Sequence, residues 1–248
     1  MKYTVITGAS SGIGYETALA FARKGKNLIL VARRKEKLEE LRTQVIEINQ
    51  QLEVIIKVSD LSDTKQTYEL YDSLSEYEIE TWINNAGLGD SSAVVDEDLA
   101  KIENLLSVNV KALTILSTLY ARNYADTDGA QLINVSSGMG YVIALGSVVY
   151  SASKYYVSAF TEGLAQELKD AKLNVKILAP AVTETEFIDR ANNVENFDYQ
   201  TGVSHFHTAV EMAEFMMALY ESDKIIGIID GKYEFSLRDQ IYPVLKGL

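Results

Sequence analysis

Hydrophobic residues along the chain follow two alternating patterns. Short runs rich in β-branched residues are separated by longer stretches in which apolar residues recur every three or four positions. The runs predict strands at 3–7, 27–32, 54–58, 81–84, 131–136, 174–179 and 225–229. The stretches between them predict helices near 13–24, 35–50, 63–76, 97–125, 150–170 and 209–221. This alternation favours a doubly wound α/β fold, with a mostly parallel seven-stranded sheet and helices on both of its faces.

A single domain over residues 1–248 is the simplest interpretation of this pattern. No linker rich in proline, glycine or serine, no internal repeat and no low-complexity tract divides the sequence. Pro180 ends the sixth predicted strand, and Pro243 lies in the C-terminal tail. The stretch from about 181 to 208 has the weakest pattern. Because a loop of that length in a compact domain is usually functional, we expect it to form a lid over a site.

Composition narrows the classes of partner. The chain has 23 basic and 35 acidic side chains and a net charge of −12, which disfavours nucleic acid or an anionic membrane as a broad-surface partner. It contains no cysteine, which excludes disulfides and thiolate chemistry. No apolar run approaches the ~20 residues that span a bilayer, and the first residues do not resemble a signal peptide. We therefore expect a cytoplasmic protein that does not bind membranes.

A glycine-rich stretch follows the first predicted strand and opens the first helix. Its spacing, Gly8-x-x-x-Gly12-x-Gly14, is typical of a turn that brings the backbone close to the pyrophosphate of a dinucleotide. The helix N-terminus there offers free N–H groups and a positive dipole end to an anion. The same stretch supplies Ser10, Ser11 and Ile13 as further contacts. Taken alone, it fits an ordinary glycine-rich turn about equally well.

The end of the second strand favours the dinucleotide interpretation. NAD-binding folds usually place an acidic residue there, whereas a nearby arginine suits the 2′-phosphate of NADP. The chain has Arg33 and Arg34 at this position and no acid. A solvated basic helix start is the alternative, but cations at a helix N-terminus oppose the helix dipole. We therefore expect NADP(H) as the cofactor, with Arg33 binding the 2′-phosphate bidentately and Arg34 as a further contact.

Two further strand ends fall on the same edge of the sheet. Asp60 and Leu61 follow the third strand and are candidates for holding the adenine. The alternative is that Asp60 is merely solvated beside a helix capped by Ser62. The stretch Asn85-Ala86-Gly87 follows the fourth strand, where small and amide-bearing residues would let the cofactor cross.

A tyrosine and a lysine open the fifth predicted helix. Tyr150 and Lys154 are four residues apart and share one helix face. An ammonium close to the phenol, together with a positively charged nicotinamide, would lower the tyrosine pKa and make it an acid–base group for a carbonyl or alcohol oxygen. Ser137, just past the fifth strand, is placed to hold that oxygen. Asn109 is polar in an apolar segment; it is either a satisfied buried amide or a water-bridged link to Lys154 in a proton relay.

Together these motifs resemble the short-chain dehydrogenase/reductase family, in its single-domain branch of about this length. The resemblance rests on Thr7–Gly14, Asn84–Gly87, Asn109, Ser137, Tyr150-x-x-x-Lys154 and Pro180, in the expected order from residue 1 to about 187. It implies a single dinucleotide-binding domain and hydride transfer between nicotinamide and a small-molecule carbonyl or secondary alcohol.

The resemblance also assigns roles. It implies that Tyr150 is the general acid/base, that Lys154 lowers its pKa and holds the nicotinamide ribose, that Ser137 polarises the substrate and that Asn109 completes the proton relay. Contacts to the nicotinamide end are implied for Pro180, Val182 and Thr185. Many relatives are homodimers or homotetramers. One departure is Pro180-Ala181, where the family usually has Pro-Gly.

Two other functions stay open at this stage. A non-catalytic NADP sensor would keep the glycine loop, although such proteins can lose the tyrosine or lysine that this chain retains. A sugar-nucleotide epimerase shares the Tyr-x-x-x-Lys chemistry but usually has a larger C-terminal domain. His205 and His207 have no evident third ligand, so we expect no metal site. Phe187 and Phe206 are candidates for capping the substrate pocket from the lid.

Overall fold

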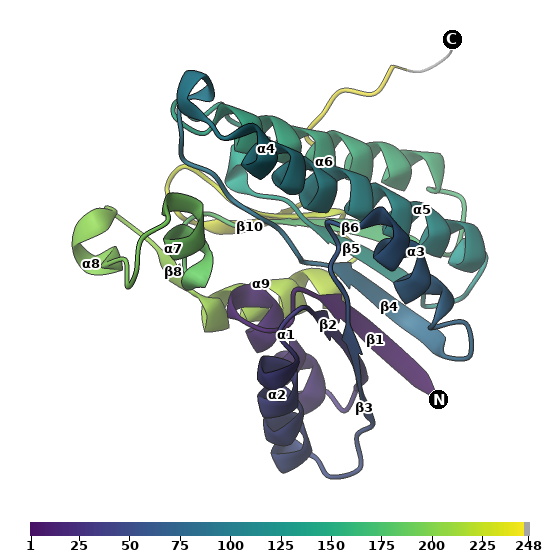
Figure 1. Ribbon diagram of the computed structural model, residues 1–248. Coiled ribbons are helices and arrows are strands. Elements are labelled where there is room, and N and C mark those ends of the chain that lie inside the picture. Colours follow the sequence, from purple (N-terminus) through teal and green to yellow (C-terminus); the bar gives the residue numbers. More distant parts are fainter. Residues whose placement is uncertain (246–248) are drawn as a thin grey trace.

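The computed structural model describes residues 1–245 and has two helical layers around one central sheet (Figure 1). The sheet strands are β1 (Lys2–Thr7), β2 (Asn27–Ala32), β3 (Val54–Val58), β4 (Glu78–Asn84), β5 (Gln131–Val135), β6 (Asn174–Ala179), β9 (Ile226–Ile229) and β10 (Phe235–Arg238). The longer helices are α1 (Gly12–Arg23), α2 (Lys35–Ile48), α3 (Thr64–Asp72), α4 (Leu99–Leu106), α5 (Leu113–Tyr124), α6 (Val148–Glu167) and α9 (Ala209–Glu221). The expected doubly wound α/β fold is confirmed.

The order of the strands creates a crevice at one edge of the sheet. The order is β10-β9-β6-β5-β4-β1-β2-β3, so the chain winds outward from β1 in one direction and then returns to build the other half from β4. The switch between the two halves lies between β1 and β4. Ligands of open α/β sheets bind at the carboxyl ends of the strands at such a point, and the glycine-rich stretch follows β1 directly.

Alternate residues of the inner strands enter the two opposite cores. Ile6 packs in the cluster under α1, α2 and α9, whereas its neighbour Val5 packs in the cluster under α3 and α5. Because side chains of a strand alternate between faces, a sheet covered on both sides needs apolar residues at successive positions. Trp82 in β4 is fully buried in the second cluster, and its indole N–H donates to the Asn84 side chain at 2.8 Å.

The prediction of seven strands was short by one. All seven predicted strands are present and parallel, but β10 pairs antiparallel with β9 at the edge of the sheet. The four residues of β10 carry only two large apolar side chains, and both faces of the strand are partly exposed. A short edge strand of this kind leaves no hydrophobic run in the sequence.

The helix predicted over 97–125 is interrupted. It consists of α4, a π-helical segment η2 (Ser107–Ala112) and α5, preceded by the short 3-10 helix η1 (Val94–Asp96). Apolar residues continue through η2 at helical spacing, so the change of winding has no signature in the hydrophobic pattern. A π-turn inserts one extra residue and is frequently found at functional sites; here it contains Asn109.

The weakly patterned stretch 181–208 is ordered into short elements. It contains β7 (Thr183–Glu184), α7 (Glu186–Asn192), α8 (Tyr199–Gly202) and β8 (His207–Thr208), and β7 pairs with β8. In Figure 1 these elements project beyond the open edge of the sheet, at the left of the view. None of the helices described over residues 1–245 is both long and apolar enough to cross a bilayer.

Candidate active site

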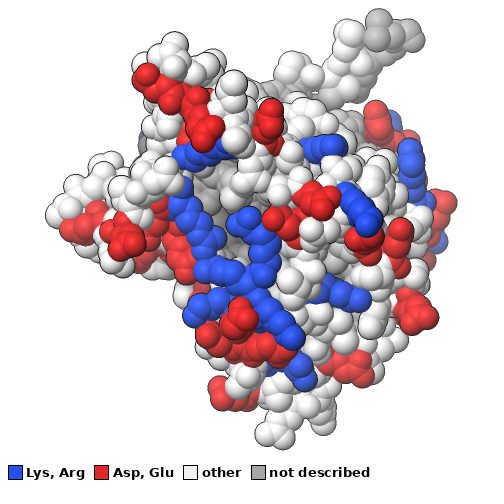
Figure 2. Space-filling model, viewed as in Figure 1, with Lys and Arg blue, Asp and Glu red and all other residues white. Residues whose placement is uncertain are grey.

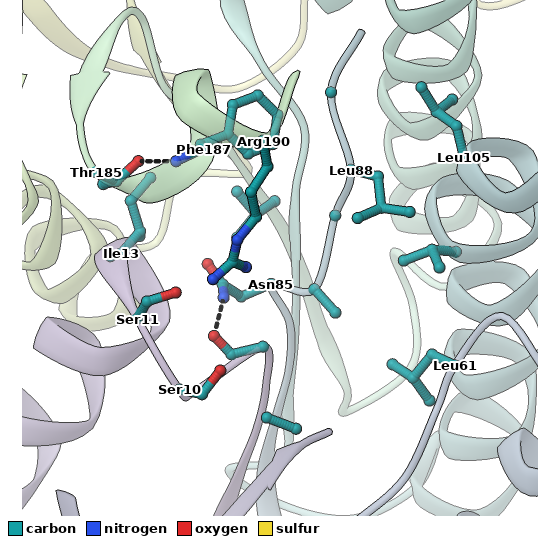
Figure 3. A pocket seen from close by; sticks show the side chains of 18 of the residues that line it. Ser10, Ser11, Ile13, Leu61, Asn85, Leu88, Leu105, Thr185, Phe187 and Arg190 are labelled. Atoms are coloured by element: carbon teal, nitrogen blue, oxygen red, sulfur yellow. Dashed lines mark hydrogen bonds between the residues drawn. The ribbon is translucent and has the colours of Figure 1, made fainter. Parts of the chain in front are cut away.

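A cavity of about 570 Å³ opens at the carboxyl ends of β1, β2, β4 and β5 (Figure 3). It brings together most of the residues expected to hold a cofactor or substrate. The predicted residues that line it are Gly8, Ser10, Ser11, Gly12, Ile13, Arg33, Arg34, Asp60, Leu61, Asn85, Ala86, Gly87, Ser137, Tyr150, Lys154, Pro180 and Thr185.

The glycine loop adopts a backbone that other residues would strain. Gly8 has φ +69° and Gly12 has φ +58°, both in the left-handed region. A Cβ on Gly14 would lie 2.3 Å from Nδ2 of Asn85 and 2.6 Å from the carbonyl oxygen of Gly8. These two positive φ angles and the close approach at Gly14 account for the glycine spacing.

The loop after β4 is fastened to the end of β1. The Thr7 hydroxyl accepts hydrogen bonds from the backbone N–H groups of Asn85 at 3.0 Å and Ala86 at 3.1 Å. The Asn85 amide donates to the carbonyl of Thr7 at 2.9 Å. These side-chain bonds therefore extend the β1–β4 backbone ladder past its last pair, Ile6 and Ile83, and fix the floor of the cavity.

The lid packs directly on the glycine loop. A Cβ on Gly12 would lie 2.9 Å from Cγ2 of Thr185, so the absence of a side chain at position 12 makes room for the lid. Thr185 is the N-cap of α7, and its hydroxyl accepts from the N–H of Phe187 at 3.2 Å. The phenol of Tyr199 in α8 bonds both the carbonyl and the N–H of Thr185. Thr185 thus joins the glycine loop to both lid helices.

Basic side chains surround the cavity in an otherwise acidic protein. Figure 2 shows them around the hollow near the middle of this face. Arg34 donates to the Ser10 hydroxyl at 3.1 Å and to the Ser11 hydroxyl at 2.9 Å. Arg33 is more open, with 54% of its side chain exposed, and lies 3.7 Å from the Asp60 carboxylate. Arg34 therefore holds the glycine loop, while Arg33 faces the solvent side of the cavity.

Asp60 is part of the cavity wall, but Ser62 is not the cap of the following helix. The N-cap of α3 is Asp63, whose carboxylate accepts from the N–H groups of Lys65 and Gln66. The carboxylate of Asp60 accepts from the N–H of Ser62 at 3.0 Å and from its hydroxyl at 2.8 Å. These bonds and Arg33 hold the pKa of Asp60 below its usual range despite partial burial, so Asp60 is a fixed anion beside the guanidinium.

Tyr150, Ser137 and Lys154 converge at the inner end of the cavity. Tyr150 and Lys154 lie in the first two turns of α6, and the ammonium is 5.9 Å from the centre of the phenol ring. Lys154 donates to the carbonyl of Val135 at the end of β5, at 3.0 Å. Ser137 caps the 3-10 helix η3 (Gly138–Gly140) by accepting from the N–H of Met139 at 3.1 Å. This bond uses an acceptor position of the hydroxyl and leaves its proton free to donate.

Close packing fixes η3 against α6. A Cβ on Gly140 would lie 2.5 Å from the hydroxyls of both Ser136 and Ser158, and 2.7 Å from the carbonyl of Lys154. The Ser136 hydroxyl donates to that same carbonyl at 3.0 Å. The segment that carries Ser137 can therefore approach the helix that carries Lys154 only because position 140 is glycine.

Burial shifts the pKa values of both groups toward the neutral form. It raises the pKa of Tyr150 to about 12, an effect that hydrogen bonding from Ser137 partly opposes. Burial also lowers the pKa of Lys154 to about 8. The protein's own groups thus place the tyrosine pKa above its ordinary value, opposite to the lowering expected from a neighbouring ammonium. Lowering it toward neutrality requires further positive charge in the cavity.

Asn109 has a fully satisfied side chain. Its amide donates to the carbonyl of Leu88 at 2.8 Å and to the Ser153 hydroxyl at 3.1 Å, and its oxygen accepts from the N–H of Leu88 at 2.8 Å. These bonds join η2 to the loop after β4 and to α6. Asn109, Gly14 and Val182 are the three predicted site residues that do not line the cavity.

Other lining residues were not predicted as cofactor or catalytic residues. They include two cations, Lys101 from α4 and Arg190 from α7, besides small and apolar residues such as Leu88, Gly89, Leu105 and Val108. Lys101 pairs with the buried carboxylate of Asp90 at 2.5 Å. No spacing rule links these positions to the glycine loop; the only signal in the sequence was their location in the helices, or in the loop after β4, that border the predicted site.

The aromatic and histidine residues of the lid have different positions. Phe187 lines the cavity, with its ring centre 5.8 Å from that of Tyr150, whereas Phe206 packs on Tyr199 instead. The rings of His205 and His207 both pack against the ring of Tyr233. Their centres lie 5.1 and 6.0 Å, respectively, from the centre of the Tyr233 ring.

The residues present fit a dinucleotide. Gly8 and Gly12 turn the loop at positive φ, the first turn of α1 carries no acidic residue, and Ser11, its N-cap, makes no capping bond with its side chain. Backbone N–H groups, two serine hydroxyls and an arginine therefore face the cavity together. This is a donor set for phosphate groups.

Comparisons with known proteins agree with this geometry. Residues 2–196 match the family model described as short chain dehydrogenase. The chain is 36% identical over 187 residues to sulfoacetaldehyde reductase 2 of Chromohalobacter salexigens, covering 74% of this chain and 73% of that protein. It is 32% identical over 195 residues to the NADP-dependent 3-hydroxy acid dehydrogenase of Schizosaccharomyces pombe, covering 75% and 73%.

The fold is also found among solved structures. A short-chain dehydrogenase from Sphingobium yanoikuyae in complex with NADPH superposes with a TM-score of 0.85 at 29% identity, over 92% of this chain and 87% of that one. The family model covers the glycine loop, the segments that carry Ser137 and Tyr150–Lys154, and the first half of the lid. The chain therefore belongs to the short-chain dehydrogenase/reductase family of oxidoreductases, whose members use NAD(P) and small-molecule substrates.

Proposed function

We propose that this protein is an NADP(H)-dependent oxidoreductase that transfers hydride between nicotinamide and a carbonyl or secondary alcohol carbon. The observation that carries the proposal is the position of Tyr150, Lys154 and Ser137 in the same cavity as the glycine loop and the two arginines after β2. The residues proposed to bind the cofactor and the acid–base side chains thus line one cavity, which the lid closes on one side.

Each side chain has a distinct task in this proposal. Bound nicotinamide supplies or accepts the hydride. Tyr150 gives its phenolic proton to the substrate oxygen during reduction and takes it back during oxidation. Ser137 donates its hydroxyl proton to the same oxygen, since the bond from the N–H of Met139 uses only an acceptor position of that hydroxyl. Lys154 places a positive charge beside the phenol and so stabilises the tyrosinate.

We assign Asn109 a positioning role in addition to its part in the proton relay expected from the sequence. Its three side-chain hydrogen bonds, to Leu88 and Ser153, support the positioning role. With the amide engaged in this way, a relay to Lys154 would run through water and the backbone of the π-helical segment. Val182 and Pro180 are proposed to contact the nicotinamide end through their backbones.

Preference for NADP(H) over NAD(H) is assigned to Arg33 and Arg34. Both follow β2, both line the cavity, and no acidic residue lies at that strand end to bind a free ribose hydroxyl. A named relative is NADP-dependent, and one structural neighbour was solved with NADPH, which supports the same preference. We also propose a homodimer or homotetramer acting in the cytoplasm, which sedimentation and fractionation would test.

The central test is an NADPH-oxidation screen over ketones, aldehydes, diketones, keto-sugars and short aldehydes bearing a sulfonate or carboxylate. Tyr150→Phe should lose nearly all turnover, about 10³-fold or more, while its NADPH affinity stays within twofold. The matched control is Tyr156→Phe on the same helix, whose hydroxyl bonds Thr114 at the surface. Full activity in Tyr150→Phe would contradict the mechanism. NADPH binding by the wild type without turnover of any carbonyl would favour the sensor function instead.

A further inference from the structure

A carboxylate from the lid lies among the arginines of the cavity. Glu186 is the first residue of α7, and its Oε2 accepts from Nη1 of Arg34 at 3.0 Å. The same oxygen accepts a second hydrogen bond, from Nη2 of Arg190 one turn further along α7. Arg34 and Glu186 are 152 residues apart in the chain, so this contact connects the cofactor loop to the lid.

Arg190 reaches into the cavity from the lid. It lines the cavity wall, and Figure 3 shows its side chain extending from α7 toward Asn85 and the glycine loop. Partial burial and the charges of Arg34 and Arg33 lower its pKa, although Glu186 opposes this. Three guanidinium groups therefore share one region of positive potential.

The hydrogen bonds of Arg34 are divided between the glycine loop and the lid. Its Nε and Nη2 hold the backbone and hydroxyls of Ser10 and Ser11, and its Nη1 holds Glu186. One edge of the guanidinium therefore binds the glycine loop, and the other edge binds an anion. In the protein alone, that anion is a carboxylate supplied by the lid.

We propose that Arg190 is a third ligand for the 2′-phosphate of NADP(H) and that Glu186 is an internal anion competing with that phosphate for Arg34 and Arg190. This rests on the proposed use of NADP(H). A phosphate dianion and the Glu186 carboxylate repel each other and cannot share the two guanidiniums, so binding of NADP(H) releases Glu186. NAD(H) has no 2′-phosphate and leaves the Glu186 contacts in place. The lid thereby adds to cofactor selectivity.

Two charge-neutralising variants on α7 test this proposal, because they should change the affinity for NADP⁺ in opposite directions. Arg190→Met should weaken binding of NADP⁺ and of 2′,5′-ADP about tenfold, because a charge-assisted contact to the phosphate is lost. Glu186→Gln should tighten binding of both about three- to tenfold, because the competing anion is gone. Affinity for NAD⁺ should stay within twofold in either variant. Dissociation constants from titration calorimetry give these values without any turnover.

Matched controls come from an exposed pair on α2. Arg42 and Glu39 lie 3.4 Å apart and are not among the cavity-lining residues. Arg42→Met and Glu39→Gln change the net charge equally, and all affinities should stay within twofold. This separates a local contact from a general effect of the protein's charge.

The outcomes separate this inference from the proposed function. Equal weakening of NAD⁺ and NADP⁺ in Arg190→Met would place the arginine on the pyrophosphate and overturn the assignment. Unchanged affinities in that variant, or weaker NADP⁺ binding in Glu186→Gln, would also overturn it. Wild-type protein that binds NAD⁺ and NADP⁺ equally would refute the NADP preference itself, and this inference with it. A wild-type preference for NADP⁺ with unresponsive variants would refute the inference alone.

Discussion

At the scale of single residues, the protein buries an acid and a base side by side and shifts both away from their charged forms. Lys154 keeps one strong hydrogen bond, to the Val135 carbonyl, and burial brings its pKa to about 8. A lysine with this pKa is charged at neutral pH but loses its charge in mildly alkaline solution. Tyr150, with a pKa near 12, stays protonated throughout that range.

This electrostatic arrangement predicts the pH profile of reduction. Because only charged Lys154 stabilises the tyrosinate, kcat/KM for carbonyl reduction should fall about tenfold per pH unit above a pH of about 8. Lys154→Arg keeps its charge in this range, so the variant should be slower but should lack this alkaline limb. Steady-state kinetics between pH 6 and about 10 measure both.

A second buried lysine provides the control for this profile. Burial lowers the pKa of Lys176 to about 8 as well, but Lys176 lies in β6 and contacts the end of α9. Lys176→Arg should keep the alkaline limb of the wild type. If that substitution removes the limb and Lys154→Arg does not, the titrating group is not Lys154.

The sequence identified the residues whose chemistry is local and missed those that depend on the fold. Tyr150 and Lys154 were predictable because both lie on one helix at a fixed spacing. Arg190 and Glu186 were not predicted, because their contacts with Arg34 arise from the way the lid folds back over the glycine loop. Likewise, the pKa of Tyr150 depends on burial, which a single sequence does not state.

At the scale of secondary-structure elements, two helical glycines should respond in opposite ways to the same substitution. Gly14→Ala places a methyl group against Asn85 and the Gly8 carbonyl, and should destabilise the protein by about 2–4 kcal/mol and weaken cofactor binding. Gly163 lies inside α6 with no heavy atom within 4 Å of an added Cβ. Gly163→Ala should stabilise by about 0.5–1 kcal/mol. Urea unfolding with and without NADPH measures both, and equal effects would contradict the steric argument.

The C-terminal end of α9 depends on a residue from the sheet. Nζ of Lys176 donates to the carbonyls of Leu219, Tyr220 and Ser222 at 3.0, 2.9 and 2.7 Å. These carbonyls lie at the C-terminal end of the helix, where backbone acceptors lack partners further along it; that of Leu219 also accepts from the N–H of Ser222 at 3.2 Å. Lys176 therefore ties β6 to α9 by serving as a side-chain cap.

Removing this cap should lower stability. Lys176→Met keeps the aliphatic bulk but removes the ammonium donor from three carbonyl groups, of which that of Leu219 keeps the N–H of Ser222, at a cost of about 1–3 kcal/mol. The same change at Lys172, an exposed partner of Asp128, should cost less than about 0.5 kcal/mol. Denaturant midpoints compare the two, and equal midpoints would show that Lys176 does not cap the helix.

Elements with strong hydrophobic patterns were predicted, and those formed by tertiary contact were not. The inner strands were found because strands covered on both faces, such as β2, have continuous apolar runs. The edge strand β10 and the short helices of the lid have neither length nor periodicity to detect. The alternative that Ser62 caps helix α3 was wrong because Ser62 and Asp63 are both suitable N-cap residues, and only the backbone shows which one is used.

At the scale of the whole molecule, the C-terminal segment is fastened across α6, the helix that carries Tyr150 and Lys154. The buried carboxylate of Glu162 in α6 accepts from the N–H groups of Ile241 and Tyr242 at 2.8 and 2.9 Å, and from the Tyr141 hydroxyl at 2.8 Å. The Tyr242 hydroxyl in turn donates to the carbonyl of Gly140 at 2.5 Å. The tail thus connects the far end of the chain to the segment that carries Ser137.

Loss of this carboxylate should free the tail. Glu162→Ala leaves three donors without an acceptor and should destabilise the protein by about 2–4 kcal/mol. Hydrogen exchange should speed up over residues 239–245 and around η3, with a smaller change elsewhere. Glu167→Ala, at an exposed position near the end of the same helix, is the control and should change neither. Unchanged protection of the tail in Glu162→Ala would contradict this role.

The π-helical segment η2 has a consequence for how the chain tolerates changes in length. Six residues, Ser107–Ala112, are wound with backbone hydrogen bonds that span one residue more than those of the α-helices on either side. Deleting a residue between Asn109 and α5 would favour regular α-helical winding, but it would rotate Asn109 relative to α5 and withdraw its amide from Leu88. The residues of this segment can be replaced as long as the apolar spacing is kept, but the length of the segment cannot change. In an alignment of relatives that share this site, gaps should therefore fall in the lid and the surface loops and be absent from residues 107–112.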